Sequence, residues 1–164
     1  MALPNKVLPG FSAALYAQSG ASPTALTLTQ LSTLANVSAI AVSANLVPVE
    51  AVPAFGQDDA VANFSVAGSR QSDKIPTQSA PTSMSVTAAW NPSDSVLLLL
   101  RGDAYSGIVD RTFVVAASDG TNIVYYAFNA RVSQFTIDAQ PGAEAKCNFT
   151  IHPRGNLYGW SNNV

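Results

Sequence analysis

Charged side chains are scarce in this 164-residue sequence, in which Asp, Glu, Lys and Arg together make up 11% of the residues. A soluble domain usually contains about 25% of such residues. The hydrophobic share of 48% is ordinary, so uncharged polar residues stand where charges would otherwise be. A free monomer generally relies on surface charge for solubility, whereas a subunit covered by its neighbours does not. The composition therefore favours a protein that assembles with copies of itself, and a merely Ser/Thr-rich surface is the alternative.

Cysteine and histidine are represented by one residue each, which limits the available chemistry. Cys147 alone cannot form an intramolecular disulfide, and with His152 it does not complete the four ligands of a zinc site. No G-x-S-x-G turn supplies a nucleophile, and no Gly-rich phosphate loop follows a predicted strand. The Asp58-Asp59 pair lacks the surrounding pattern of a calcium loop. We therefore expect a protein without enzymatic activity, cofactor or metal.

Long uninterrupted apolar runs are also missing. Residues 35–55 contain one charge only, but asparagines and prolines interrupt them and make a poor membrane span. Pro4, Pro9 and Gly10 interrupt the N-terminal stretch, which does not fit a secretory signal. The net charge of −2 provides no basic surface that would hold nucleic-acid phosphates. The sequence predicts a single domain over residues 1–164, in which residues 1–10 form an N-terminal arm.

The first half of the chain alternates between predicted strands and long connections. The predicted strands cover residues 11–17, 37–47 and 59–67, where β-branched or alternating apolar residues are found. Prolines, glycines and polar residues predict two long loops, over residues 45–56 and 68–82. Loops of this length usually have a function or become ordered by a partner.

The second half has a clearer pattern. A predicted strand over residues 84–90 leads into a short helix, for which Asn91 is the candidate cap and Pro92 the first residue. Gly107 indicates that the helix ends near Ser106. Four strands then follow almost without interruption, and the Asp-Gly pair at residues 119–120 marks a tight turn between the first two. These strands cover residues 112–117 and 124–132, a segment with Phe135 and Ile137, and residues 143–151.

This order predicts a mainly β fold, an antiparallel β-sandwich or partly closed barrel with one short α-helix and long loops. The apolar sides of the strands predict the core residues Trp90, Phe128, Phe149 and Ile151. Apolar residues in loops are unfavourable in water, at about 25 cal/mol per Å² of exposed apolar surface. The candidate residues for contacts between subunits are accordingly Val47, Val49, Val52 and Phe55, with Lys74 and Ile75 in the second loop. The alternative is that these segments pack under their own domain as a satellite cluster.

The second half resembles the major tail tube proteins of long-tailed bacteriophages with non-contractile tails. The resemblance covers residues 83–155, a little under half of the chain, and consists in the order of its elements. These elements are the strand at residues 84–90, the helix that follows Asn91, the Asp-Gly hairpin beginning at residues 111–115, the segment 126–132 with Phe135, and the strand at residues 143–151. Some members of this family carry an additional immunoglobulin-like C-terminal domain, which we do not expect here, because the sequence ends soon after Trp160.

The resemblance implies a structural virion protein. Subunits of the family form rings, usually hexameric, which stack into a hollow tube, and their strands join into one closed barrel around the lumen. Loops and the N-terminal arm reach the next ring, and double-stranded DNA passes through during genome ejection without specific binding. The implied partners are copies of the chain itself, the tape measure protein and the tail terminator, with no membrane. The implied location is the virion tail, and the host cytoplasm during assembly.

Three alternatives remain open at this point. Another virion protein, such as a decoration, connector or contractile-tail inner tube protein, belongs to the same structural class. A β-sandwich binding or adhesin module would be monomeric and would expose aromatic residues in a cleft. An enzyme would need convergent polar residues that the sequence patterns do not reveal.

Overall fold

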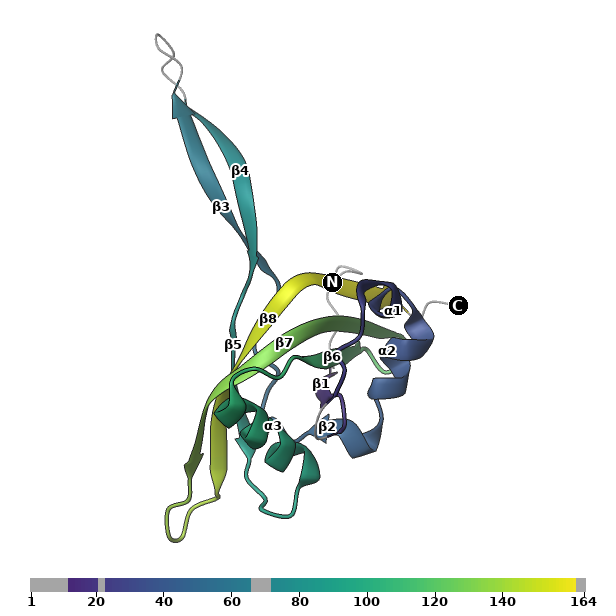
Figure 1. Ribbon diagram of the computed structural model, residues 1–164, viewed down its shortest axis with the longest axis vertical. Helices are drawn as coiled ribbons and strands as arrows, with labels where there is room; N and C mark the ends of the chain where they lie inside the picture. Colours follow the sequence, from purple (N-terminus) through teal and green to yellow (C-terminus); the bar gives the residue numbers. More distant parts are fainter. Residues whose placement is uncertain (1–11, 21–22, 66–71, 162–164) are drawn as a thin grey trace, which may run out of the picture.

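A curved six-stranded antiparallel sheet forms the body of the protein (Figure 1). The computed structural model describes residues 12–20, 23–65 and 72–161. The strand order is β2-β1-β6-β7-β8-β5. The strands are β1 (Ser12–Ala17), β2 (Leu46–Val47), β5 (Met84–Ala89), β6 (Arg111–Ser118), β7 (Ile123–Asp138) and β8 (Lys146–Ser161). A second sheet contains only β3 (Gln57–Ser65) and β4 (Ser72–Pro81).

The curved sheet is partly closed at one end. The segment after β2 bonds to β5, the strand at the opposite edge, through an antiparallel bridge between Val49 and Ala88. The amide of Glu50 donates to the carbonyl of Thr87 at 3.0 Å, and the amide of Ala89 donates to the carbonyl of Pro48 at 2.9 Å. The mainly β, antiparallel and partly closed fold predicted from the sequence is therefore confirmed.

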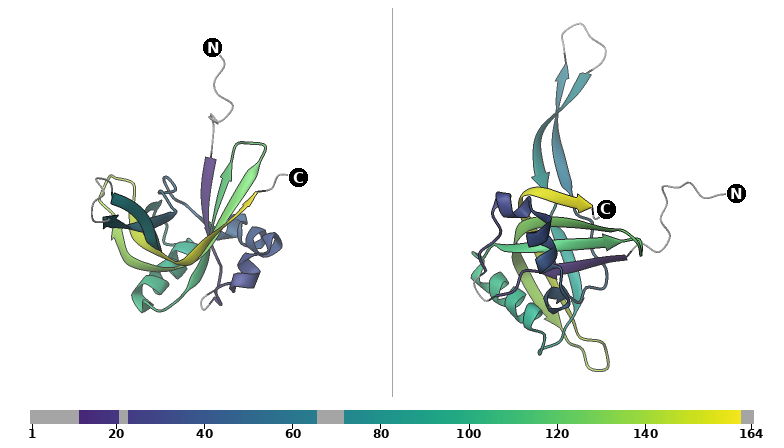
Figure 2. Two further views of the ribbon diagram at one scale, coloured as in Figure 1. Left: turned by 90° about the horizontal axis from the view of Figure 1, so that it is seen from above. Right: turned by 90° about the vertical axis from the view of Figure 1, so that its right-hand side faces the viewer.

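Helices cover both faces of the sheet (Figures 1 and 2). The helix α3 (Ser95–Ser106) packs on one face, over the main hydrophobic core. The helices α1 (Leu28–Leu31) and α2 (Leu34–Ile40) pack on the other face, where Leu31, Val37 and Ile40 contact Val114 and Ala127. In the described residues, no helix is both long and apolar enough to cross a membrane.

The main core lies between α3 and the strands. Phe128, Phe149 and Ile151 are fully buried there, and Trp90 is half-buried at its margin. The ring of Phe149 stacks on that of Phe135 with 5.6 Å between centroids, and the Trp90 ring meets Phe135 edge-on at 5.8 Å.

The strand predicted over residues 37–47 is wrong. Its first part belongs to α2, and a short 3₁₀ helix, η1 (Ser43–Asn45), leads into β2. Val37 and Ile40 are three residues apart and therefore lie on the same side of the helix, where the sheet buries them. The side chain of Asn45 donates to the carbonyl of Ile40 at 3.0 Å and closes the segment. Packing of a helical face thus prevailed over the β propensity of Val and Ile.

The loop predicted over residues 68–82 is also wrong, because most of it is β4. This strand pairs with β3 from Gln57–Pro81 at one end to Ser65–Ser72 at the other. Pro76 is tolerated because it lies beside the register shift at Val61, and prolines within sheets are confined to edge strands and bulges. The predicted strand at residues 59–67 corresponds to β3, and its last two residues lie outside the described part of the chain.

The end of the chain forms fewer and longer strands than predicted. The segment with Phe135 and Ile137 is the second half of β7, continuous across a bulge at which Gln134 has a φ of 55°. The predicted strand at residues 143–151 begins at Lys146 and continues to Ser161. The pairing of β7 with β8 resumes after each of its two register shifts, so each strand continues beyond the interruption. The polar residues between the apolar runs had concealed this continuity.

The single predicted helix is α3, and its cap differs from the prediction. Asp94 caps it, accepting hydrogen bonds from the amides of Val96 at 2.9 Å and Leu97 at 3.3 Å. Asn91 instead accepts from the amide of Ser93 in the preceding turn. The predicted end at residue 106 is confirmed. The short helices α1 and α2 were not predicted.

Two glycines of α3 should respond oppositely to substitution by alanine. Gly107 follows the helix with a φ of 67°, so Gly107→Ala should cost about 1–2 kcal/mol in left-handed backbone strain. Gly102 lies inside the helix with open space around it, so Gly102→Ala should stabilise by about 0.5–1 kcal/mol. Urea unfolding of both variants measures the difference. Equal shifts in the same direction would contradict the backbone assignment at residue 107.

Candidate assembly surfaces

The β3–β4 hairpin, called the arm from here on, projects away from the curved sheet (Figures 1 and 2). It forms a two-stranded sheet of its own. Its described side chains are exposed except that of Pro81, which is half-buried at the base. An isolated two-stranded hairpin is at best marginally stable in water. The arm therefore has the properties of an element that a partner surface completes.

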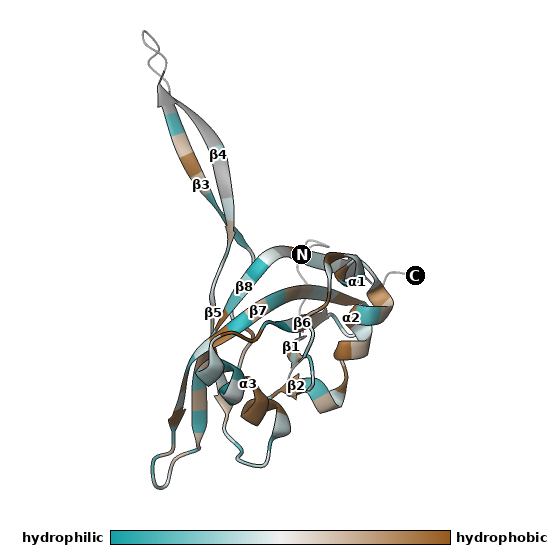
Figure 3. Ribbon diagram, viewed as in Figure 1, coloured by the Kyte–Doolittle hydropathy of each residue, from teal (hydrophilic) through white to brown (hydrophobic). Residues whose placement is uncertain are grey.

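The arm is chemically mixed along its length. Asp58 and Asp59 are exposed near the base, and Val61, which is 53% exposed, lies opposite Pro76 in the ladder. Figure 3 shows hydrophilic and hydrophobic residues following one another along β3. A partner would thus cover apolar side chains and also meet charged ones.

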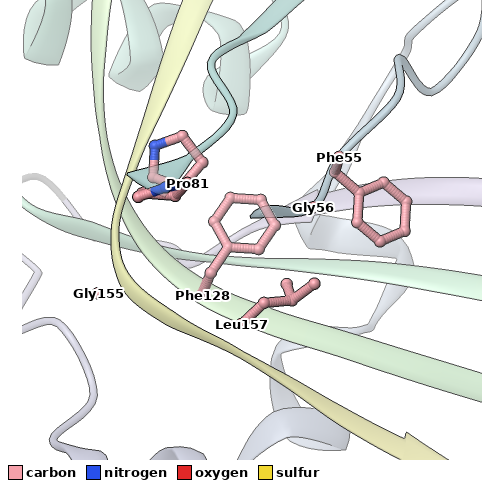
Figure 4. A pocket seen from close by; sticks show the side chains of 7 residues that line it. Phe55, Gly56, Pro81, Phe128, Gly155 and Leu157 are labelled. Atoms are coloured by element: carbon pink, nitrogen blue, oxygen red, sulfur yellow. The ribbon is translucent and has the colours of Figure 1, made fainter. Parts of the chain in front are cut away.

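Apolar packing anchors the base of the arm to the sheet. The amide of Thr82 donates to the carbonyl of Gly56 at 3.0 Å, which closes the base. Phe55 packs on Tyr126 with 5.1 Å between ring centroids. A cavity of about 10 Å³ remains at this junction (Figure 4), and its lining consists of Phe55, Gly56, Pro81, Phe128, Pro153, Gly155 and Leu157. So small a space shows a well-packed junction and no ligand site.

The first group of predicted contact residues lies against the domain's own core. Val47 is buried, and Val49, Val52 and Phe55 are half-buried against the same cluster. This placement corresponds to the alternative in which the segment packs under its own domain, because the chain after β2 runs along the edge of β5. Most of residues 45–56 is a connection, as predicted, although β2 lies within it.

The second group lies on the arm. Lys74 and Ile75 belong to β4 and pair with Asn63 and Ala62 in the ladder. Their side chains lie outside the described part of the structure. Of the two segments predicted to contact other subunits, the second therefore contributes β4 to the projecting arm, whereas the first packs on the domain's own core.

A second exposed surface is the part of the sheet that α1 and α2 leave uncovered. Polar residues of β5, β7 and β8 form it, and it is called the polar face below. Its members are Ser85, Thr87, Arg131, Ser133, Thr136, Asn148, Thr150, His152 and Arg154. Cross-strand hydrogen bonds join them, such as the one that Thr87 Oγ1 donates to Asn148 Oδ1 at 2.7 Å.

His152 lies within the polar face, between two serine hydroxyls. Ser83 Oγ is 2.9 Å from Nδ1, and Ser133 Oγ is 2.8 Å from Nε2. A catalytic histidine needs an acid that orients its second nitrogen, whereas here that nitrogen faces another hydroxyl. The arrangement is that of a surface hydrogen-bond network.

Two arginines of the polar face share one carboxylate. Asp110 Oδ1 accepts from Arg131 Nε at 2.6 Å, and Asp110 Oδ2 accepts from Arg154 Nη1 at 2.8 Å. The hydrogen bond from Arg131 is the main cause of a lowered pKa of Asp110, and Arg154 acts in the same direction against partial burial. Asp110 therefore remains ionised at neutral pH, and the cluster carries a surplus of one positive charge.

Another charged group lies inside the protein. Asp103 at the end of α3 accepts from Arg111 Nε at 2.5 Å, and both side chains are buried. Arg111 Nη1 also donates to the carbonyls of Gln18 and Gly20. This ion pair fastens α3 and β6 to the end of β1, so its role is structural.

The one thiol is also internal. Cys147 is fully buried opposite Ala88, and burial raises the pKa of its thiol. A thiol with a raised pKa is a poor nucleophile and metal ligand. Among the described residues, no group of three or more His, Cys, Asp or Glu side chains is placed to hold a metal ion.

Sequence reasoning missed the cluster of Arg131, Arg154 and Asp110. The signal available in the sequence is that both arginines occupy polar positions in strands whose apolar and polar residues alternate, which places each of them on the side of its strand away from the core. Their proximity depends on the register of β7 against β8, in which Arg131 lies opposite His152 and Asn129 lies opposite Arg154.

No family model matches the chain, and no curated protein matches its sequence. Solved structures do match along almost the whole length. One is a chain from the sheath/tube terminator of an extracellular contractile injection system, PVC, at a TM-score of 0.61 and 12% identity over 98% of this chain and 97% of that chain. Another belongs to the tube terminating cap of the anti-feeding prophage, with a TM-score of 0.62 and 12% identity, and the match covers 98% of this chain and 95% of that chain. A third is from the SPP1 tail tube, with a TM-score of 0.54 and 11% identity, and the match covers 93% of this chain and 77% of that chain. At these identities the likeness shows a shared fold.

Proposed function

We propose that this chain is a non-enzymatic structural subunit that assembles with its own copies into the hollow tail tube of a phage-like particle. The subunits form stacked rings, which we expect to be hexameric, and double-stranded DNA passes through the lumen. The tube belongs to the virion tail and is built in the host cytoplasm. Its further partners are a tape measure protein and a tail terminator.

The arm is the observation that carries this proposal. It extends a two-stranded sheet into solvent with its described side chains exposed, although such a hairpin gains little stability alone. Contact with a neighbouring subunit would cover Val61 and supply the packing that the arm lacks. The low charged fraction of 11% supports the same conclusion, because a covered surface needs few charges.

The matched structures support the proposal, since they come from tube-forming particles and share the fold over at least 93% of this chain in the three cases described. One comes from a contractile injection system, one from a tube terminating cap and one from a tail tube. We retain a non-contractile tail as the more specific proposal, and a contractile-tail inner tube is compatible with the same fold. Mixing the assembled tubes with a sheath protein from the same genome distinguishes them, because only a contractile system should show decoration.

A tube terminator is the second candidate function. Two of the matched structures are those of a sheath/tube terminator and of a tube terminating cap. A terminator forms one ring at the end of a tube, whereas a tube protein adds rings repeatedly.

Negative-stain electron microscopy of the purified protein tests the assignment. Tubes of variable length are the expected result and support a tube subunit. Single rings that do not elongate would favour the terminator. Monomers at all concentrations and salt conditions would contradict both candidates and leave a monomeric binding module.

A further inference from the structure

Charged groups lie at the two ends of the polar face. At one end Arg131 and Arg154 share Asp110. At the other end Lys146 contacts Glu50 and lies opposite Asp138 in the ladder. About seven residues of β7 separate the ends, or roughly 23 Å at about 3.3 Å per residue. This exceeds the screening length of about 8 Å at physiological salt, so the two ends act independently on a ligand.

The arginine cluster is built so that it can accept an anion. Arg131 and Arg154 come from adjacent strands, and their side chains are 40% and 54% exposed. Asp110 occupies some of their donors and is itself 35% exposed. A guanidinium has five N–H donors, so donors remain for a second oxygen anion. Phosphate is the anion that arginine pairs bind with particularly favourable geometry.

We propose that the cluster of Arg131, Asp110 and Arg154 is a weak contact site for the phosphate backbone of double-stranded DNA. This inference rests on the proposed function, and it adds that the polar face is the side of the sheet that faces the lumen of the tube. The central part of the face carries neutral hydroxyl and amide groups that already bond to one another, such as Thr87 to Asn148 and Thr150 to the neighbouring Gln134. Each subunit therefore offers DNA one point of attraction, which Asp110 weakens, and the DNA can slide.

The same chemistry favours DNA over a polypeptide as the occupant. The polar face contains no aromatic or large aliphatic side chain among its nine members, so it has nothing to hold an apolar helix. A surplus of positive charge at one place suits a regular polyanion, whose phosphates recur along both strands. The whole chain has a net charge of −2, so attraction to DNA must come from a local site.

Fluorescence anisotropy of a labelled 30-base-pair duplex with unassembled protein tests the site at about 20 mM salt. Weak binding is expected, with an affinity that falls as salt rises. Arg131→Gln and Arg154→Gln should each reduce the salt slope by about 0.9, the value for one phosphate contact. Asp110→Asn should tighten binding about two- to five-fold, because the competing carboxylate loses its charge.

Arg101→Gln on α3 is the matched control, because it removes one half-buried arginine, which lies over the Tyr105 ring outside the polar face, and should leave binding unchanged. Loss of folding would not raise the affinity for DNA, so a gain of affinity in Asp110→Asn has to come from the site itself. Equal binding by wild type and both arginine variants would overturn the proposal, as would no gain in Asp110→Asn. Binding of an uncharged amphipathic peptide at this face, without binding of DNA, would also overturn it. The measurement uses unassembled subunits, so a failure to form tubes and a failure to bind DNA are separate results.

Discussion

Replacing residues 58–80 of the arm by an Asn-Gly turn should yield a folded subunit that no longer forms tubes or rings. Gln57 and Pro81 are direct partners in the ladder, so a two-residue turn can join them without disturbing the base. The core should remain intact, because the arm forms a separate sheet. Assembly should be lost because the removed strands carry the surface that a neighbour covers. Negative-stain microscopy and size-exclusion chromatography measure assembly, and circular dichroism measures folding.

A pair of single substitutions refines this experiment. Val61→Ser removes an exposed apolar side chain from the arm and should weaken assembly measurably. Leu28→Ser on α1 is its control, since this side chain is 66% exposed but lies on the body of the protein. Normal tubes from the arm-replaced variant would show that the arm has no part in assembly.

Asp103→Ala should destabilise the subunit by about 3–5 kcal/mol, the usual cost of leaving one member of a buried ion pair unpaired. Arg111 would keep its charge inside the core, where it is only 1% exposed. The carbonyls of Gln18 and Gly20 can accept its hydrogen bonds but cannot neutralise it. Urea unfolding of unassembled protein gives the free energy, because assembly would mask a loss of subunit stability.

The double variant Asp103→Leu with Arg111→Met separates charge from packing. Replacing both members of a buried pair by apolar side chains is often close to neutral. Most of the stability lost in Asp103→Ala should therefore return, with a remaining deficit from the two carbonyls that lose their donor. A double variant less stable than Asp103→Ala would contradict an electrostatic cause.

The predictions from sequence succeeded where local pattern and tertiary packing agree. The strand near residues 84–90 alternates between apolar and polar residues, because one side of it faces the core under α3. The strand at residues 112–117 is almost wholly apolar, because both of its sides are covered, with Phe113 and Val115 in the main core and Val114 under α1 and α2. The predictions failed where packing decided against local propensity, as at residues 37–47. Val37 and Ile40 favour a strand locally, but their shared helical face fits the sheet at Val114 and Ala127. The arm was predicted as half strand and half loop, because prolines usually indicate a loop. The prolines of β4 are tolerated because it is an edge strand, which the sequence alone does not reveal.

The candidate surfaces divide in the same way. Composition and alternation directly predict a charge-poor, mainly β chain with one thiol and one histidine. Which apolar connection is covered by its own domain, and which segment extends as the arm, depends instead on how the elements pack. That packing also brings Arg131 and Arg154 together at Asp110, although 21 residues separate Asp110 from Arg131 and 44 separate it from Arg154. Such pairings depend on strand register, which hydrogen bonds across the whole sheet fix, and no local run of residues records it.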